Sequence, residues 1–208
     1  MFPNLSGLYA ITDPHLMPGK ALFTGVRAAL SGGANIIQYR NKLSSRTQQR
    51  DEATELLRMT SDFGALLLIN DDLALCLDIN ADGVHLGRSD GDISAARRAL
   101  GPTKVLGVTC HSDLHYAKDC RILGANYCAF GRVFPSKTKP NAPSCSLTTL
   151  KEAAVANYPS VAIGGIDTNN AQQVIACGVD MIAVIHGLFG QTDIRQAATQ
   201  ISQLFSQE

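Results

Sequence analysis

The chain has 208 residues, of which 45% are hydrophobic and 17% charged, as is typical of one globular domain with a large core. The 18 Lys and Arg residues balance the 18 Asp and Glu residues, so we expect no nucleic-acid partner and no anionic membrane surface as a partner. No apolar run is long enough to span a membrane, and we expect no signal peptide at the N-terminus.

Eight short apolar runs predict eight β-strands. They are Leu8–Thr12, Ile36–Arg40, Leu66–Asn70, Gly83–Gly87, Val105–Thr109, Tyr127–Gly131, Val161–Gly165 and Met181–Ile185. Helical patterns lie between them, such as residues 47–63, where Ala53, Leu56, Leu57 and Phe63 fall at helical spacing, and residues 193–205. This alternation favours parallel strands, and eight units in one 1–208 domain indicate a (β/α)8 TIM barrel. A doubly wound open sheet is the main alternative.

A short pattern recurs before every second strand. Its copies are Gly33-Ala34-Asn35, Asn80-Ala81-Asp82, Gly124-Ala125-Asn126 and Gly178-Val179-Asp180. Gly or Asn at the first position can adopt the left-handed conformation that ends a helix. The Asn or Asp then leads into the next strand. We interpret these residues as structural and place them at the end of the barrel opposite the site.

The six cysteines show no metal-ligand or redox spacing. Cys76, Cys110, Cys120, Cys128, Cys145 and Cys177 are scattered, without a CxxC pair. We interpret them as reduced thiols that fill apolar niches of a cytoplasmic protein. A Cys110–His111 nucleophile is disfavoured because no Asp partner is visible.

Polar residues follow each predicted strand, and these ends converge on one face of a barrel. The run Leu66–Ile69 stops at Asn70, Asp71 and Asp72, which packing alone does not explain. We therefore expect a densely charged pocket there. His85, inside an apolar strand, is interpreted as a core histidine with satisfied hydrogen bonds.

The segment Gln38–Lys42 predicts an anion-binding cradle. Gln38, Arg40 and Lys42 alternate with Tyr39 and Asn41, so an extended chain puts the first three side chains on one side. Arg can hold phosphate oxygens through two bonds, and Lys acts as a point charge. The alternative is a set of solvated loop charges.

Asp71 and Asp90 predict a magnesium site, because they follow adjacent strands and could share one cation. The alternative is helix capping, by Asp71 or Asp72 before Leu73 and by Asp90 or Asp92 before Ile93. We prefer capping for Asp72 and Asp92.

A second phosphate site is predicted where the seventh and eighth strands end. The segment Ala162–Ile166 contains a Gly pair, and Ile185-His186-Gly187 ends the last strand, so backbone N–H groups can approach an anion. A cationic site and a neutral amide site together indicate two phosphorylated small-molecule substrates, one of them a diphosphate.

Eight segments, in this order, resemble the thiamine-phosphate synthase family over nearly the whole chain. They are LYAITDP, IIQYRNK, LLLINDD, DGVHLGRSD, LGVTCHS, FGRVFPSKTKP, VAIGGI and IAVIHGLF. The resemblance implies a barrel enzyme that joins 4-amino-2-methyl-5-hydroxymethylpyrimidine diphosphate to 4-methyl-5-(2-phosphoethyl)thiazole, with Mg²⁺ and release of diphosphate. It also implies a dissociative reaction, in which diphosphate leaves before the thiazole nitrogen attacks.

The resemblance also implies roles for single residues. Pyrimidine diphosphate ligands would be Gln38, Tyr39, Arg40, Asn41, Lys42, Asn70, Thr109 and Lys139. Thiazole phosphate ligands would be Ser136, Lys137, Thr138, Gly165, Ile185 and His186. Asp71 and Asp90 would hold the metal, and the catalytic contacts would come from Arg40, Lys42, Lys139 and Thr109. We expect the loop 134–146 to close over the diphosphate, because Lys139 reaches the site only from there.

Three positions depart from the family pattern. His186 and Thr109 stand where Ser is common, and Arg132 stands where Pro is common before the loop. Two rival functions share the expected fold. One is a thiazole tautomerase-like enzyme, which would need no diphosphate machinery, and the other is a non-catalytic sensor of a thiamine intermediate.

Overall fold

Eight parallel strands form a closed barrel in the computed structural model, which describes residues 5–135, 143–156 and 158–205. The strands are β1 (Gly7–Ile11), β2 (Ala34–Tyr39), β3 (Leu66–Asn70), β4 (Gly83–Leu86), β5 (Val105–His111), β6 (Tyr127–Gly131), β7 (Ser160–Ile163) and β8 (Met181–Val184). Because β1 pairs with both β2 and β8, the sheet has no edge, and the open-sheet alternative is wrong. Each predicted strand is confirmed within two residues at either end.

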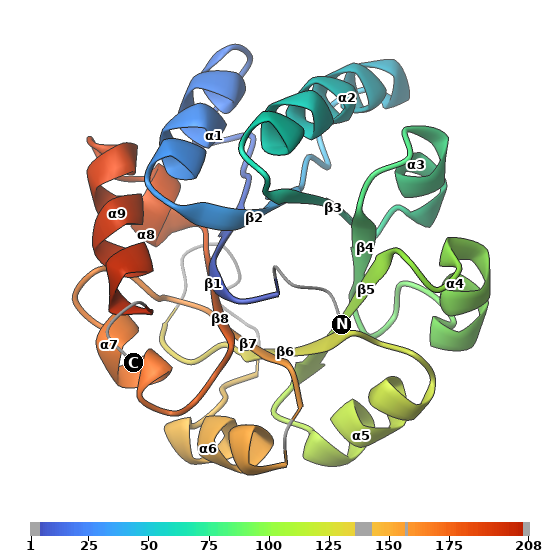
Figure 1. The fold of residues 1–208 in the computed structure, drawn as a ribbon, viewed down its shortest axis with the longest axis vertical. Helices are drawn as coiled ribbons and strands as arrows, with labels where there is room; N and C mark the ends of the chain where they lie inside the picture. Colours follow the sequence, from blue (N-terminus) through green and yellow to red (C-terminus); the bar gives the residue numbers. More distant parts are fainter. Residues whose placement is uncertain (1–4, 136–142, 157, 206–208) are drawn as a thin grey trace.

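Helices surround the barrel (Figure 1). They are α1 (Ala21–Ser31), α2 (Arg46–Asp62), α3 (Leu73–Asp78), α4 (Ile93–Leu100), α5 (Leu114–Ile122), α6 (Leu147–Val155), α7 (Ala171–Ile175), α8 (His186–Phe189) and α9 (Ile194–Leu204). Ala53 and Leu56 of α2 are buried as expected, whereas Phe63 follows the last helical residue and is 42% exposed. Within the described ranges no helix combines the length and the apolar character needed to cross a membrane.

Apolar side chains form two layers of core. Alternate strand residues point outward into the layer under the helices, and the others point into the barrel, as the pleat requires. The inner layer contains two fully buried tyrosines, Tyr9 and Tyr127. The polar ends of these two tyrosines therefore lie inside the barrel.

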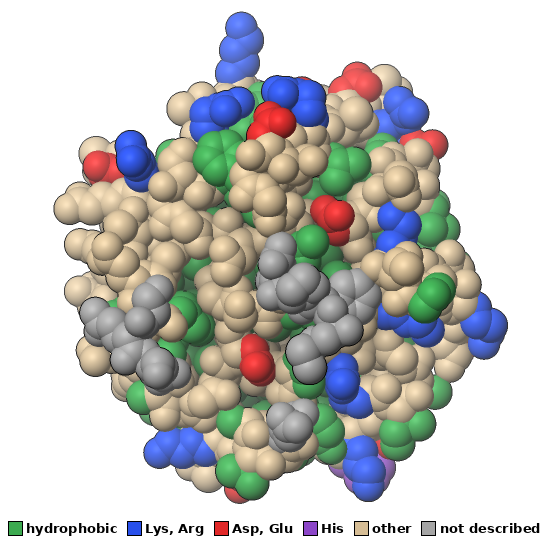
Figure 2. Space-filling model, in the orientation of Figure 1, with side chains coloured by type: hydrophobic (Ala, Val, Ile, Leu, Met, Phe, Trp, Pro, Cys, Tyr) green, Lys and Arg blue, Asp and Glu red, His purple; other side chains and the backbone are tan. Residues whose placement is uncertain are grey.

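On the outer surface, acidic and basic side chains are interspersed over the face seen in Figure 2, mostly toward its rim.

The repeated pattern before the even-numbered strands has the structural role predicted for it. The first residues have φ angles of 97° at Gly33, 58° at Asn80, 105° at Gly124 and 84° at Gly178. In three copies the last side chain accepts a backbone N–H from the preceding strand: Asp82 from Leu67 at 2.7 Å, Asn126 from Leu106 at 2.7 Å and Asp180 from Ser160 at 2.8 Å. In the first copy the Asn35 amide donates to the Ser6 carbonyl at 2.9 Å. Each copy thus ties a strand to the beginning of its neighbour.

Replacing Asp82 with Ala is expected to lower the free energy of unfolding by about 1–2 kcal/mol, because the Leu67 N–H loses its acceptor. Urea unfolding followed by circular dichroism measures this. The control is Asp78→Ala, which removes a surface ion pair with Arg50 between two half-exposed side chains and is expected to cost less than about 0.5 kcal/mol. Equal losses in the two variants would contradict the role of the repeat.

Candidate active site

A cavity of about 620 Å³ opens at the carboxyl ends of the strands. Every strand contributes to its wall, through Tyr9 and Ile11, Gln38, Asn70, His85, Thr109 and His111, Ala129 and Gly131, Val161 and Ile163, and Ala183. The loops that follow the strands add charged side chains. A chain without net charge therefore concentrates opposite charges at one place, as the polar strand ends predicted.

The segment after β2 points alternate side chains in opposite directions. Gln38, Arg40 and Lys42 line the cavity, which confirms the predicted alternation. The structure does not bring Tyr39 and Asn41 to this cavity. They border a smaller neighbouring cavity of about 300 Å³, between this segment and α3.

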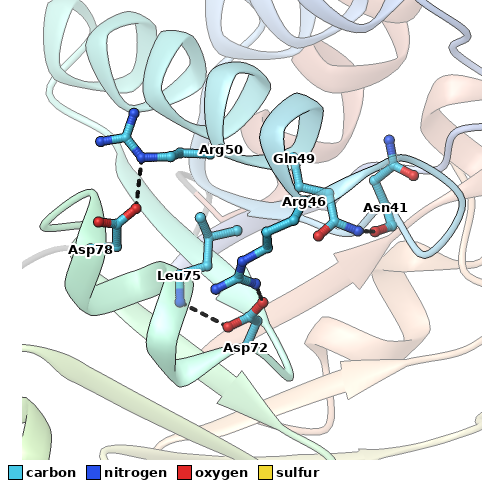
Figure 3. Close-up of polar contacts among 7 residues, drawn as sticks. All are labelled: Asn41, Arg46, Gln49, Arg50, Asp72, Leu75 and Asp78. Atoms are coloured by element: carbon cyan, nitrogen blue, oxygen red, sulfur yellow. Dashed lines mark hydrogen bonds and ion pairs between the residues drawn. The ribbon is translucent and has the colours of Figure 1, made fainter.

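Tyr39 and Asn41 are held by Glu52, a buried residue of α2. The Tyr39 hydroxyl donates to the Glu52 carboxylate at 2.6 Å, and the Asn41 amide donates to the same oxygen at 3.0 Å. Burial, with Glu52 beside it, raises the pKa of Tyr39. On the same segment Gln49 of α2 donates to the Asn41 carbonyl at 2.8 Å (Figure 3). This anchoring fixes the backbone from which Arg40 and Lys42 project.

The Arg40 backbone is fixed, while its guanidinium has no hydrogen bond or ion pair among the described residues. The Arg40 N–H donates to the Thr12 hydroxyl oxygen at 2.8 Å, and that hydroxyl donates to the Arg40 carbonyl at 3.3 Å. A partly buried Arg that lines a cavity without a protein partner is suited to bind an anion from solution.

Asp71 lies at the centre of the charged cluster. Its carboxylate is 2.8 Å from the Lys42 ammonium and accepts a bond from the Asn70 amide at 2.7 Å. Burial alone would raise the pKa of Asp71, but the Lys42 charge and the Asn70 amide hold it below its ordinary value. Desolvation and the neighbouring Asp71 carboxylate raise the pKa of Asp90. The opposite shifts of two adjacent carboxyls are typical of groups that compete for one proton or one cation.

The capping alternatives for Asp71 and Asp90 are wrong. The side chain of Asp72 accepts the Leu75 N–H at 2.8 Å and caps α3, and Asp92 accepts the Ala95 N–H at 2.6 Å and caps α4. Arg46 of α2 also pairs with Asp72 (Figure 3), which does not line the large cavity. The preferred interpretation of Asp72 and Asp92 is thus confirmed.

The donor set around Asp71 and Asp90 fits a hard cation that is completed by a ligand. Both carboxylates border the space over Gly87, where a Cβ atom would lie 2.2 Å from an Asp90 oxygen and 3.9 Å from an Asp71 oxygen. Within the described ranges no group of three or more His, Cys, Asp or Glu side chains is arranged to hold a metal. Mg²⁺ is commonly held by one or two carboxylates together with water and substrate phosphates, so two carboxylates suffice.

A chain of side-chain hydrogen bonds crosses the floor of the cavity. It runs from the Gln38 amide to Tyr9 at 2.5 Å, to Tyr127 at 2.9 Å, to His85 Nδ1 at 2.9 Å, and from His85 Nε2 to Thr109 at 2.9 Å. His85 is 9% exposed with both ring nitrogens bonded, as the core interpretation predicts, and it also lines the cavity. The sequence reasoning missed Tyr9 and Tyr127, because a Tyr in an apolar strand reads as packing. The available signal was their position in the strand alternation, which places both side chains on the face that points into the barrel.

The predicted phosphate residues of β7 and β8 line the same cavity. Gly165, Ile185 and His186 are among its lining residues. A Cβ on Gly165 would lie 2.5 Å from the Pro135 carbonyl oxygen, and its φ of 64° also favours glycine. The close approach of these loops therefore requires a glycine, and it leaves backbone exposed at the cavity wall.

Ser136, Lys137, Thr138 and Lys139 lie outside the described residues, so their contacts stay predictions. Residues on the two sides of this segment are hydrogen-bonded to each other. The Arg132 N–H donates to the Pro143 carbonyl at 2.9 Å, and the Cys145 N–H donates to the Arg132 carbonyl at 2.7 Å. Arg132 and Pro135 line the cavity, so the segment begins at the site.

All six cysteines are buried and free, as predicted. Cys110 does not line the cavity, and the adjacent Cys128 thiol together with burial raises the pKa of Cys110. A thiol that stays protonated and out of reach cannot act as a nucleophile, which agrees with the expectation from sequence.

Comparison with known proteins finds one family over most of the chain. A family model described as thiamine monophosphate synthase matches residues 8–188. Among curated relatives, the thiamine-phosphate synthase of Alcanivorax borkumensis is 50% identical over 206 residues, covering 97% of this chain and 95% of the relative. The thiamine-phosphate synthase of Nitrosococcus oceani is 47% identical, with 99% and 95% covered.

A solved structure agrees. A thiamine phosphate pyrophosphorylase from Pyrococcus furiosus superimposes with a TM-score of 0.89 at 34% identity, covering 98% of this chain and 97% of the other. Both the sequence and the barrel are therefore similar to these proteins from end to end.

Proposed function

This chain belongs to the thiamine monophosphate synthase family, a family of transferases in thiamine biosynthesis, and from this premise we propose the reaction that it catalyses. The substrates are 4-amino-2-methyl-5-hydroxymethylpyrimidine diphosphate and 4-methyl-5-(2-phosphoethyl)thiazole, and the products are thiamine phosphate and diphosphate. The observation that carries the proposal is the cavity where Arg40 and Lys42 lie beside Asp71 and Asp90.

The diphosphate would bind on the side of the cavity formed by β2 and β3. The Arg40 guanidinium has no hydrogen bond or ion pair among the described residues, and Lys42 projects from the same edge, so both can neutralise phosphate oxygens. Asn70 borders this region and Lys139 is expected to join it. Removal of such a charged contact typically costs about 10²–10³-fold in rate.

Asp71 and Asp90 would hold Mg²⁺. The bound ion would supply positive charge to the diphosphate as the carbon–oxygen bond breaks. The residues themselves set where that charge lies, since Asp71 is fixed by Asn70 and by its own N–H, which donates to the His85 carbonyl at 2.8 Å.

The two organic rings would occupy the floor and the opposite side. Gln38 and Thr109 offer an amide and a hydroxyl to the pyrimidine. Gly165, Ile185 and His186 offer backbone at the β7–β8 side, where the thiazole phosphate would bind. A backbone contact tolerates His186 in place of the common Ser, and Thr109 keeps the hydroxyl.

A dissociative course suits these groups. The bonding electron pair leaves with the diphosphate, and the thiazole nitrogen then gives its lone pair to the pyrimidine methylene cation. No base is required at that nitrogen. Burial raises the pKa of Tyr9 and of Tyr127, and both ring nitrogens of His85 are engaged. Catalysis would rest on positioning and on stabilising the leaving diphosphate.

The decisive experiment mixes purified protein with both substrates and MgCl₂ and follows thiamine phosphate and diphosphate by chromatography. Formation of both products is expected. A tautomerase-like enzyme would isomerise a thiazole phosphate without releasing diphosphate, and a sensor would bind without turnover. Folded protein that gives neither product with intact substrates contradicts the proposal.

Removal of Mg²⁺ is expected to lower turnover by at least about 10²-fold, because several kcal/mol of charge stabilisation are lost. The assay compares protein with excess EDTA, with EDTA saturated by Mg²⁺ as the control, and with Mg²⁺ added back. Since protons compete with the cation at Asp90, whose pKa is raised, the Mg²⁺ concentration for half-maximal rate is expected to rise as pH falls. Full activity in EDTA would exclude the metal.

A further inference from the structure

We propose that the buried Tyr9–Tyr127 pair is a positioning element that couples the orientation of the Gln38 amide to that of the Thr109 hydroxyl. The coupling would make the floor of the cavity select one pattern of hydrogen-bond donors and acceptors in its ligand. The coupling stands on the hydrogen-bond geometry, whereas the identity of the ligand rests on the proposed function.

The connection between the two ends runs through a residue that a ligand cannot touch. Gln38, Tyr9, His85 and Thr109 line the cavity, whereas Tyr127 does not and is fully buried. Its ring meets Tyr9 edge to face, with centroids 6.0 Å apart, and stacks on His85 at 5.7 Å. Tyr127 therefore joins the two halves of the hydrogen-bond chain from behind the cavity wall.

The barrel leaves space for Tyr127 at this place. Gly107 of β5 is paired with Tyr127 of β6 in the sheet register. A Cβ on Gly107 would lie 2.0 Å from the Tyr127 ring carbon that bears the hydroxyl. The Tyr127 ring therefore occupies space that is open only because residue 107 of the neighbouring strand has no side chain.

Proton counting gives the chain a direction. Each neutral phenol has one hydrogen to donate, and burial keeps both tyrosines neutral. With the Gln38 amide nitrogen toward Tyr9, Tyr9 donates to Tyr127, and Tyr127 donates to His85 Nδ1. A neutral His85 then carries its proton on Nε2 and donates to Thr109. Thr109 keeps its own hydrogen for a ligand, and Gln38 keeps its amide oxygen.

With a neutral His85, one other arrangement satisfies every link. If the Gln38 amide turns over, its oxygen accepts from Tyr9, and each remaining bond must reverse as far as Thr109. Gln38 would then present N–H groups, and Thr109 would present only a lone pair. A mixed state leaves two hydrogens, or two lone pairs, facing each other at a buried link, which is costly. The orientations of the Gln38 amide and the Thr109 hydroxyl therefore change together.

This coupling turns into selectivity between ligands. The arrangement with the Gln38 nitrogen toward Tyr9 offers an acceptor at Gln38 and a donor at Thr109. A ring with an amino group can present a donor at one edge and ring-nitrogen acceptors at another, and so fits this arrangement. A ring with an oxo group in place of the amine presents an acceptor where a donor was. It fits only after every hydrogen bond from Gln38 to Thr109 has reversed from the arrangement in the structure, in which the Gln38 nitrogen donates to Tyr9.

The test is Tyr127→Phe, which keeps the ring and removes only the middle hydroxyl. We expect the KM for the pyrimidine diphosphate to rise about tenfold, as for the loss of about 1.4 kcal/mol of binding, while the KM for the thiazole phosphate stays within about twofold. The preference in kcat/KM for the amino over the 4-oxo pyrimidine diphosphate is expected to fall about tenfold. The matched control is Tyr116→Phe on α5, whose ring lies under Arg88 outside the chain of bonds.

A second measurement does not depend on turnover. Nitrogen-15 NMR of the imidazole, assigned with a His85→Asn variant, is expected to show the Nε2–H tautomer in the wild type and a mixture in Tyr127→Phe. Should Tyr127→Phe not fold, Tyr9→Phe breaks the same chain one link earlier and is expected to give the same results.

The outcomes separate the two proposals. Wild-type protein without product formation contradicts the proposed function, yet the NMR comparison still tests the coupling. Unchanged tautomer populations in the variant overturn the coupling. A variant that is less stable but keeps both KM values and the full preference for the amino ring also overturns it, because that result marks a merely structural tyrosine.

Discussion

Replacing Asp71 with Asn is expected to lower kcat/KM by about 10²–10³-fold, while the free energy of unfolding changes by less than about 1 kcal/mol. The substitution keeps the shape and removes one negative charge. That charge is the one paired with Lys42 at 2.8 Å, and it is held in place by the Asn70 amide. Steady-state kinetics and thermal unfolding measure the two quantities.

The effect on stability is small because Asn can adopt the same backbone conformation and the ion pair is partly exposed. Asp71 has a φ of 60°, which Asn also tolerates, and the Lys42 side chain is 60% exposed, so water screens their attraction. The effect on rate is large because the lost charge is one of two that would hold the cation against the diphosphate. A loss of stability with normal turnover would assign Asp71 a structural role.

The neighbouring carboxylate supplies the control, with the opposite outcome expected. Asp72→Ala removes the cap of α3 and the pair with Arg46, and is expected to cost about 1 kcal/mol of stability. Its turnover below the melting range should stay near that of the wild type, because Asp72 does not line the large cavity. The variants of these two adjacent aspartates therefore test a role in catalysis and a role in helix capping separately.

Replacing Arg97 with Ala is expected to lower the free energy of unfolding by about 3 kcal/mol, or the melting temperature by about 6–12 °C. The Arg97 guanidinium donates to the carbonyls of Gly101, Lys104 and Gly124 at 2.7–3.0 Å and to the Asn126 side chain at 2.5 Å. It joins the loops before β5 and β6 at the end of the barrel away from the site. Removal leaves four acceptors without this donor.

The adjacent Arg98 offers the control, since it is exposed on the same helix and has no hydrogen bond among the described residues. Arg98→Ala is expected to change stability by less than about 0.5 kcal/mol. Arg97→Lys should fall between, because an ammonium keeps the charge but cannot span the acceptors of a guanidinium. Product formation at low temperature should survive in all three variants, and its selective loss in Arg97→Ala would contradict a purely structural role.

Much of the fold could be predicted because local sequence reports burial and chain direction. A buried parallel strand is a short apolar run, so all eight strands were found. The capping residues Asp72 and Asp92 indicated where two helices begin. The alternation of Gln38, Arg40 and Lys42 with Tyr39 and Asn41 follows from the pleat. It put three side chains in the cavity, although the prediction that Tyr39 and Asn41 also bind there is not supported by their positions.

The sequence alone determined the barrel, the polar strand ends and the face on which they meet, since these follow from hydrophobic period and from parallel strands. Only the tertiary structure decided which side chains meet across the barrel. Tyr9 and Tyr127 are 118 residues apart, and their contact depends on closure of the sheet, on register and on the space over Gly107. Arg97 looked like any helix-surface cation, and its four acceptors come from separate loops. Hydrogen bonds between distant side chains depend on ångström-scale placement, which local periodicity does not encode.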